Sequence, residues 1–192
     1  MIALEETGIA YTAIPVVLAN GEHMTEAFRE LNPKGKVPAL KVDDHILTET
    51  IAILGFLSAQ HPEAALLPAS HKFDDATALA MLSWCASGLH PLVTRLRLPQ
   101  KFCDVPGSAD RVRDLARAEM KFQLGIAEKR LAGTAWLLGR NWSIADTYLA
   151  WVWGRCPESG IDPADYPELV RHHRQTMARP AAGRAIHREQ FP

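Results

Sequence analysis

The sequence predicts a small α/β domain followed by an all-helical domain. Up to about Gln60, short runs rich in branched and aromatic residues alternate with runs of helical period, which is the pattern of a mixed domain. From about Asp74 onward, the long segments have a helical period. Between the two parts, "HPEAALLPASH" (residues 61–71) has two prolines and neither period. This stretch is typical of a linker between domains.

Strands are predicted at three places in the first part. The run "AYTAIPVVLA" (residues 10–19) is rich in strand-forming residues, and Pro15 places it near a sheet edge. The runs "PALKV" and "HILT" are separated by Asp43-Asp44, a tight-turn signal. We therefore expect these two runs to form a hairpin.

Two helices are predicted in the same part. The first is the short run "TEAFRELN". The second, "TETIAILGFLSAQ", is expected to begin at Thr48 or Glu49. Its residues Ile51, Leu54 and Leu57 fall on one helical face, which predicts that this face is buried.

The second part is predicted to be helical throughout. Pro91 should kink or end the first of its helices, because proline lacks an amide N–H and clashes with the preceding turn. In the longest helix, Met120, Leu124, Ala127 and Leu131 share one face. The expected helices run from Asp74 or Asp75 to His90, from Ser108 to Gly133, from Ser143 through "SIADTYLAWVWGR", from Tyr166 to Arg179 and from Pro180 to Gln190.

The composition is that of a soluble globular protein. Of 192 residues, 47% are hydrophobic and 22% are charged, and the formal net charge is -1. This balance predicts neither a nucleic-acid nor a membrane partner, and no run reaches the ~18 apolar residues of a membrane span. Glu5 and Glu6 stand where a secretory signal needs positive charge. Three scattered cysteines without a CxxC pair are typical of a reducing compartment, so we expect a cytoplasmic protein.

The pair Val37-Pro38 comes directly before the predicted hairpin. Cis peptide bonds in proteins are almost confined to X-Pro pairs. A cis bond here would turn the main-chain N–H and C=O of Val37 out of the sheet, where they could pair with a peptide-like ligand as a short added strand. The alternative is an ordinary trans turn without a ligand.

The start of the helix in "LTETIAIL" is a candidate anion site. The first turn of a helix has unpaired N–H groups and a partial positive charge, both of which favour a carboxylate. Thr50 offers a hydroxyl to the same anion, and Glu49 could pair with a neighbouring ammonium. A ligand with an α-amino group and an α-carboxylate would match both. The alternative is that Thr48 and Glu49 only cap the helix.

Other polar residues favour structural roles. Ser143 and Asp146 have the spacing of a capping box, so Asp146 is expected to nucleate a buried helix rather than to act as a catalytic acid. His90 stands before Pro91 and is by itself most simply a satisfied histidine. His172 and His173 are adjacent and diverge around a helix, so no metal site is expected.

Four stretches spread over nearly the whole chain together resemble one known family. They are "NPKGKVPAL", "LTETIAIL", "NWSIADTYLAW" and "RPAAGRAIHRE", in that order. They are similar to a cis-proline approach, a glutamate-plus-hydroxyl motif at the third helix, a sixth-helix capping box and a common C-terminal ending. The family that they resemble is that of the cytosolic glutathione S-transferases, nearest to its bacterial, beta-like members. The resemblance implies that the first domain is thioredoxin-like.

The resemblance implies a binding site for glutathione in the first domain. The main chain at Val37-Pro38 would bind the cysteinyl backbone of the tripeptide. Glu49 and Thr50 would hold the γ-glutamyl ammonium and carboxylate. Lys36 stands where family members often have Gln, and it would reach the glycyl carboxylate.

The resemblance of "MLSWCASGLHP" to the fourth helix of beta-like members implies roles in the second domain. His90, and with it Ser83, would face the thiol of glutathione. The apolar face around Trp84, Leu89 and Val93 would line the pocket for a hydrophobic electrophile.

The sequence departs from the family pattern at its beginning. In the family, the first strand and the turn after it carry the Tyr, Ser or Cys that engages the thiolate, whereas "MIALEETGIAY" matches the second half of the helix that follows. Two explanations are open. Either the chain continues upstream of Met1 by about 15–20 residues, or the sheet is rearranged, since a deleted inner strand would leave buried backbone groups unpaired at ~1–3 kcal/mol each.

We therefore expect a glutathione transferase that attacks an electrophilic carbon with the glutathione thiolate, without a metal and as a homodimer. His90 is the one candidate in this sequence for stabilising the thiolate. One alternative is a non-catalytic glutathione-binding or protein-interaction module on the same fold, because the activating segment is absent. Another is a glutathione-dependent isomerase or dehalogenase. The predicted domains are residues 1–62 and 72–192, joined by the linker 63–71.

Overall fold

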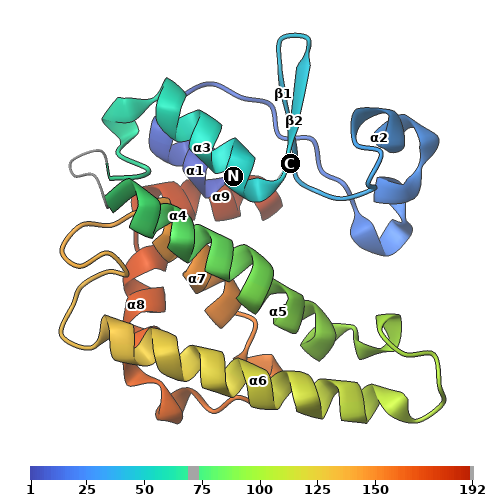
Figure 1. Ribbon diagram of the computed structural model, residues 1–192. Coiled ribbons are helices and arrows are strands. Elements are labelled where there is room, and N and C mark those ends of the chain that lie inside the picture. The colour runs from blue at the N-terminus through green and yellow to red at the C-terminus, as the bar shows by residue number, and fades with distance from the viewer. Residues whose placement is uncertain (69–73, 191–192) are drawn as a thin grey trace. The chain divides into compact units, whose positions relative to one another are not determined.

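The computed structural model describes residues 1–68 and 74–190 and contains two compact units (Figure 1). The N-terminal unit comprises Met1–Leu66 together with the chain from Pro180 onward, and the helical unit comprises Leu67–Arg179. The last helix thus belongs with the N-terminal unit, whereas the sequence suggested the second domain. Residues 69–71 of the predicted linker lie outside the described residues, and the predicted domain boundaries stay a prediction.

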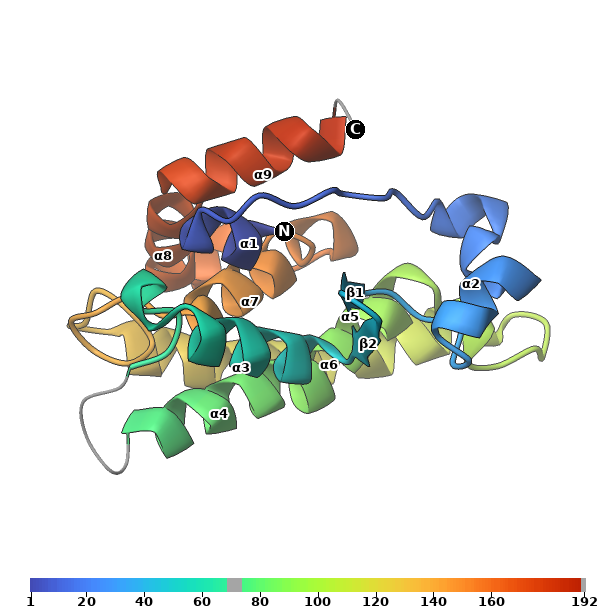
Figure 2. The ribbon, with the colours of Figure 1, turned by 90° about the horizontal axis from the view of Figure 1, so that it is seen from above.

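Among its described residues, the N-terminal unit combines four α-helices with one hairpin. Its helix α1 lies between α3 and α9 (Figure 2). The elements are α1 (Ile2–Thr7), α2 (Glu26–Leu31), β1 (Ala39–Val42), β2 (His45–Thr48), α3 (Thr50–Gln60) and α9 (Pro180–Gln190), with short turns η1 (Leu18–Asn20), η2 (Glu22–Met24) and η3 (Pro62–Ala64).

The predicted hairpin and the predicted helix after it are both present in the structure. Strands β1 and β2 pair antiparallel, with Ala39 opposite Thr48 and the turn at Asp43-Asp44. Helix α3 begins at Thr50, one to two residues later than expected. Its buried residues are Ile53, Leu54 and Leu57, so Ile53 takes the place that the sequence pattern gave to Ile51.

The predicted strand at residues 10–19 is wrong. This segment is an irregular connection that ends in η1 (Figure 2). A strand needs a neighbour for its backbone hydrogen bonds, and the one sheet within the described residues contains only β1 and β2. Two of the branched residues of the segment are accordingly exposed, Ile14 by 81% and Val17 by 43%.

The helical unit is built around the long helix α6. Met120, Leu124, Ala127 and Leu131 of α6 are completely buried, which confirms the predicted face. The unit contains α4 (Asp74–Trp84), the π-helical turn η4 (Cys85–Leu89), α5 (His90–Arg97), η5 (Pro99–Lys101), α6 (Ser108–Leu131), α7 (Ile144–Trp153), η6 (Pro157–Ser159), η7 (Pro163–Asp165) and α8 (Pro167–Met177).

Of the two outcomes predicted for Pro91, a kink or an end, the helix does not end there, and its regular α-helical pattern is interrupted just before Pro91. It continues from Asp74 to Arg97 through the π-helical turn η4, in which the His90 amide donates to the Cys85 carbonyl five residues earlier. A wider turn of this kind lets proline follow without the normal four-residue bonding pattern. By length and composition alone this stretch could cross a membrane, and 33% of its most apolar window is buried inside the structure. Leu82 and Leu89 are among its fully buried residues.

The predicted capping box at the start of α7 is confirmed and extends into the core. The Asp146 carboxylate accepts hydrogen bonds from the Ser143 amide at 2.8 Å and the Ser143 hydroxyl at 3.1 Å. It also accepts the Leu137 amide at 2.8 Å and lies 2.8 Å from His172 Nε2. Asp146 and His172 are both fully buried. This network joins α7, α8 and the segment before α7, so Asp146 has a structural role.

Candidate functional site

The candidate site in the N-terminal unit lies where the hairpin meets α3. Because Ala39 pairs with Thr48, the residues before β1 and those after β2 lie at the same end of the hairpin. The Val37–Pro38 peptide bond is cis, as the family resemblance implied. The side chain of Val37 is 42% exposed, and its amide and carbonyl have no hydrogen-bond partner within the described residues. A main-chain donor and acceptor are therefore available here.

The start of α3 presents unpaired donors. The first backbone hydrogen bond of α3 runs from the Ile53 amide to the Glu49 carbonyl at 3.0 Å, so the amides of the first three helical residues have no partner within the helix. The Thr50 hydroxyl also has no partner among the residues described. This end of α3 is therefore suited to a carboxylate.

Glu49 adopts an unusual backbone conformation at this position. Its φ of 73° is rare for a residue with a side chain, and such conformations cluster at functional sites. Neither Glu49 nor Thr48 caps α3 with its side chain. The capping alternative from the sequence is therefore not supported, and the Glu49 carboxylate is turned to another partner.

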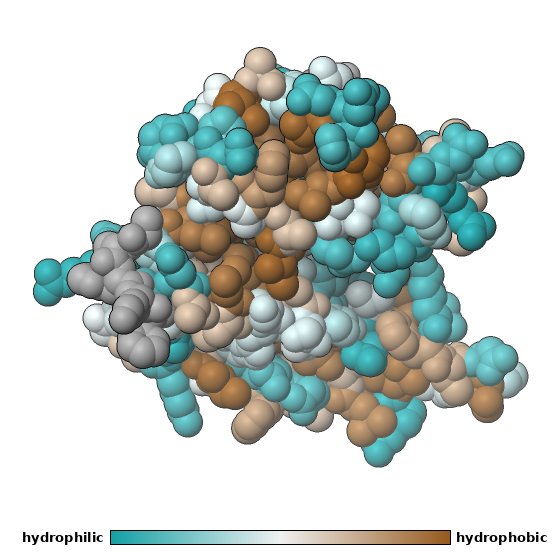
Figure 3. Space-filling view, turned by 45° about the horizontal axis from the view of Figure 1, so that its top comes forward, coloured by the Kyte–Doolittle hydropathy of each residue, from teal (hydrophilic) through white to brown (hydrophobic). Residues whose placement is uncertain are grey.

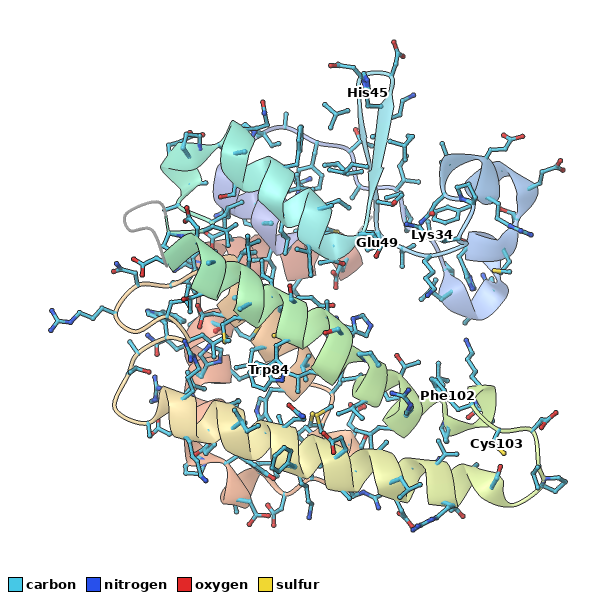
Figure 4. The ribbon with its side chains drawn as sticks, viewed as in Figure 1. Lys34, His45, Glu49, Trp84, Phe102 and Cys103 are labelled. Carbon is cyan, nitrogen blue, oxygen red and sulfur yellow. The ribbon has the colours of Figure 1, made fainter. Side chains whose placement is uncertain are left out.

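That partner is Lys34, which the sequence analysis did not identify. Lys34 Nζ lies 2.5 Å from Glu49 Oε1 and donates to Thr48 Oγ1 at 3.0 Å (Figure 4). The hydrogen bond from Lys34, then its charge, and more weakly the charge of Lys36, lower the pKa of Glu49. The only signal in the sequence was the presence of Lys34 beside Lys36 in "NPKGK". No local spacing rule connects Lys34 with a carboxylate 15 residues away.

A tight turn holds Lys34 in this place. The buried side-chain amide of Asn32 donates to the Lys36 carbonyl at 2.5 Å, and its side-chain oxygen accepts the Lys34 amide at 3.3 Å. Gly35 follows with φ of 59°, and a Cβ atom there would meet Met24 Sδ at 2.8 Å. Residues 32–36 are therefore a constrained loop, from which the exposed Lys36 side chain extends.

Ser83 and His90 belong to the helical unit and are described within it. Ser83 is on the exposed face of α4, and its carbonyl accepts the Ser87 hydroxyl at 2.7 Å. His90 is half-buried in an aromatic cluster with Tyr148 and Trp151 of α7. Its Nδ1 lies 2.8 Å from the Tyr148 hydroxyl, and its ring centre lies 4.4 Å from that of Trp151.

Tyr148 was not singled out by the sequence analysis. Burial, and next the Cys85 thiol, raise the pKa of Tyr148 to about 12, so its hydroxyl stays protonated at neutral pH. It is therefore able to donate to His90 Nδ1, which would leave the proton of a neutral imidazole on Nε2. Periodicity could only place Tyr148 on α7, because its partner is 58 residues away in the sequence.

Among the described residues, no group of three or more His, Cys, Asp or Glu side chains could hold a metal ion. The polar groups at the candidate site of the N-terminal unit are a carboxylate, hydroxyls and main-chain N–H and C=O groups, which suit a zwitterionic organic ligand.

Both parts of the chain match models of one protein family. The family model "Glutathione S-transferase, N-terminal domain" matches residues 1–60, and "Glutathione S-transferase, C-terminal domain" matches residues 59–180. The chain belongs to the glutathione S-transferase family. The predicted fold class, a thioredoxin-like domain with a small sheet followed by a helical domain, is thereby confirmed.

Named relatives agree with this membership. The chain is 31% identical to glutathione S-transferase GstA of Escherichia coli O157:H7 over 154 residues, which is 77% of this chain and 71% of GstA. It is 29% identical to maleylacetoacetate isomerase of Pseudomonas aeruginosa over 185 residues, covering 94% and 85% of the two chains. The relatives therefore include a glutathione S-transferase and a maleylacetoacetate isomerase, and the non-catalytic alternative receives no support.

The fold agrees with solved structures of bacterial members. A sphingomonad glutathione S-transferase complexed with glutathione has a TM-score of 0.85 and 36% sequence identity, and the match covers 100% of this chain and 92% of the other. The similarity thus extends over both units.

Proposed function

We propose that this protein is a glutathione transferase that conjugates glutathione to a hydrophobic electrophile. In this reaction the thiolate sulfur forms a bond to an electrophilic carbon, and a leaving group such as a halide departs with the electron pair of the broken bond. The proposal rests on two features at the same end of the hairpin. Val37 has a main-chain donor and acceptor without a partner among the described residues, and the start of α3 has unpaired amides suited to a carboxylate.

We assign the ligand contacts in the N-terminal unit by charge and by hydrogen-bonding capacity. The main chain of Val37, next to Pro38, pairs with the cysteinyl backbone of glutathione as a short added strand. Thr50 and the first amides of α3 bind the γ-glutamyl carboxylate, and Glu49 binds the ammonium beside it. Lys36 is exposed and takes the glycyl carboxylate.

We assign thiolate stabilisation to His90, with Ser83 as a polar neighbour of the thiol. This assignment rests on the resemblance of "MLSWCASGLHP" to family members. When the Tyr148 hydroxyl donates to His90 Nδ1, the proton of a neutral imidazole is on Nε2. An imidazole N–H near sulfur favours the thiolate over the thiol, whose unperturbed pKa is about 8.5.

The test combines binding with turnover. Isothermal titration of the wild type with glutathione should give saturable binding, and an activated aryl halide should be converted to its glutathione conjugate. The double variant Glu49→Ala with Thr50→Ala should weaken glutathione binding by at least about tenfold, because the charge-assisted hydrogen bond from the Thr50 hydroxyl to the γ-glutamyl carboxylate is lost. Glu30→Ala, an exposed glutamate of α2, is the matched control. Unchanged affinity of the double variant would remove this ligand site.

The isomerase relatives favour a second candidate reaction. An enzyme of that kind would convert a maleyl substrate such as maleylacetoacetate only in the presence of glutathione and would return glutathione unchanged. Measuring free thiol during turnover separates the two candidates, because conjugation consumes thiol and isomerisation does not.

We also propose a homodimer that forms through α6. Apolar residues are exposed at several places on the surface (Figure 3). On α6, Leu115, Phe122 and Ile126 are exposed by 54%, 65% and 44%, and their spacing puts them on one helical face. A second copy of this chain would cover that face. The three cysteines are free, in keeping with a place in the cytoplasm.

A further inference from the structure

The Lys34 ammonium occupies the Glu49 carboxylate, which is the group that we assign to the ligand's ammonium. Lys34 Nζ contacts both Glu49 Oε1 and Thr48 Oγ1, so its ammonium group lies between the side-chain oxygens of the two residues that precede α3. One carboxylate therefore has two candidate cations, one from the protein and one from the ligand.

We propose that Lys34 limits the selectivity of the site for the α-amino group, by acting as an internal substitute for the ligand's ammonium. This inference rests on the proposed function. In the free protein Lys34 neutralises Glu49. A ligand that carries an α-ammonium displaces Lys34 from Glu49, whereas a ligand that lacks it leaves Lys34 in place.

The exposure of the pair makes such an exchange feasible. The side chains of Lys34 and Glu49 are exposed by 47% and 66%, so a released lysine regains solvent and gives up only a weak surface ion pair. The main chain of the loop stays fixed through Asn32, because its side chain bonds to Lys34 and Lys36 main-chain atoms. The exchange therefore needs only rotation of the lysine side chain.

This arrangement makes a prediction that differs from ordinary binding. With Lys34 present, glutathione gains one ion pair and loses another, so the α-amino group adds little affinity. Without Lys34, glutathione gains the ion pair between its ammonium and Glu49 and breaks no other ion pair. A ligand that lacks the amine leaves Glu49 unpaired next to a bound carboxylate. Removing Lys34 should thus increase selectivity for the amine.

The experiment compares glutathione with glutaryl-Cys-Gly, which keeps both carboxylates and the thiol but lacks the α-ammonium. The measured quantity is the dissociation constant of glutaryl-Cys-Gly divided by that of glutathione, both obtained by isothermal titration at fixed salt. In Lys34→Met this ratio should increase by about three- to tenfold. Lys34→Arg should stay near the wild type. Lys41→Met, an exposed lysine of β1, is the charge-matched control and should not change the ratio.

A double-mutant cycle assigns the effect to the pair. In a Glu49→Gln background, Lys34→Met should no longer alter the ratio, because the shared carboxylate is gone. An unchanged or reduced ratio in Lys34→Met alone would overturn the role of Lys34 while leaving the proposed function intact. If the wild type binds neither ligand, the proposed function fails, and this inference falls with it.

Discussion

Arg184 of α9 donates hydrogen bonds to both the side chain and the main chain of Glu5 in α1, across 179 residues of sequence. Its Nε lies 2.8 Å from Glu5 Oε2, and its Nη2 lies 2.6 Å from the Glu5 carbonyl. Arg188 Nε and the Tyr11 hydroxyl donate to Glu5 Oε1 at 2.6 and 2.7 Å. Glu5 is buried, so this carboxylate fixes the last helix onto the first.

The Glu5 cluster predicts a loss of stability in acid. The hydrogen bond from Tyr11, followed by those from Arg184 and Arg188, lowers the pKa of Glu5 from 4.5 to about 2. A pKa that is lower in the folded than in the unfolded state stabilises the fold above pH 4.5, and this contribution is lost as the pH falls toward 2. Urea unfolding followed by circular dichroism between pH 2 and pH 7 should show this decrease.

Replacing Glu5 isolates its share of that decrease. Glu5→Gln should lower the free energy of unfolding at pH 7 by about 1–3 kcal/mol, because two guanidinium groups lose their charged acceptor. It should also flatten the stability curve between pH 4.5 and pH 2. Glu30→Gln is the control, since Glu30 is an exposed glutamate of α2. Equal acid sensitivity in Glu5→Gln and the wild type would contradict this assignment.

Asp146 is predicted to matter for stability more than a helix cap alone would. Its carboxylate serves the Ser143 and Leu137 amides and His172, and it is fully buried. Asp146→Ala should therefore lower the free energy of unfolding by about 3–5 kcal/mol, since several buried partners lose their acceptor. Thermal and urea unfolding measure the effect.

Asp146→Asn separates the network from simple loss of volume. Each carboxylate oxygen accepts an amide N–H, so the NH2 group of asparagine would face a donor at one of the two positions. Asparagine should therefore fail to restore stability. The folded fraction of either variant should still bind glutathione with wild-type affinity, and a selective loss of binding would indicate a direct role for Asp146.

Local sequence rules predicted the parts of the fold that depend on local interactions. The β1–β2 hairpin followed from the Asp43-Asp44 turn, and the start of α7 followed from the Ser143–Asp146 spacing. The strand predicted at residues 10–19 failed, because β-propensity cannot supply the neighbouring strand that a sheet requires. The π-helical turn before Pro91 was not predicted either, since no local rule foresees such a turn.

The candidate site divides in the same way. Glu49 and Thr50 could be identified because they stand at a helix start, where the chemistry follows from adjacent residues. Lys34 and Tyr148 could not, because each acts on a group far away in the sequence. Pairings of this kind are set by the tertiary fold.

Gly88 and Gly125 are predicted to respond oppositely to alanine. A Cβ atom at Gly88 would lie 3.0 Å from Trp84 Cδ1, and the ring cannot retreat freely because its Nε1 donates to Gln123 at 2.7 Å. Gly88→Ala should destabilise the fold by about 0.5–2 kcal/mol. Gly125 in α6 has open space, so Gly125→Ala should stabilise the fold by about 0.5–1 kcal/mol. Urea unfolding of both variants tests this difference, and changes of the same sign would refute it.

The exposed face of α6 predicts how the oligomeric state responds to one charge. Phe122 is 65% exposed, so Phe122→Glu should change the stability of an isolated chain by no more than about 0.5 kcal/mol. If a second copy covers this face, the same change buries an unpaired carboxylate and should convert dimers to monomers in sedimentation velocity runs. Lys121→Gln changes the net charge by the same amount on another face and should leave the dimer intact. A Phe122→Glu protein that sediments as the wild type does would place the interface elsewhere.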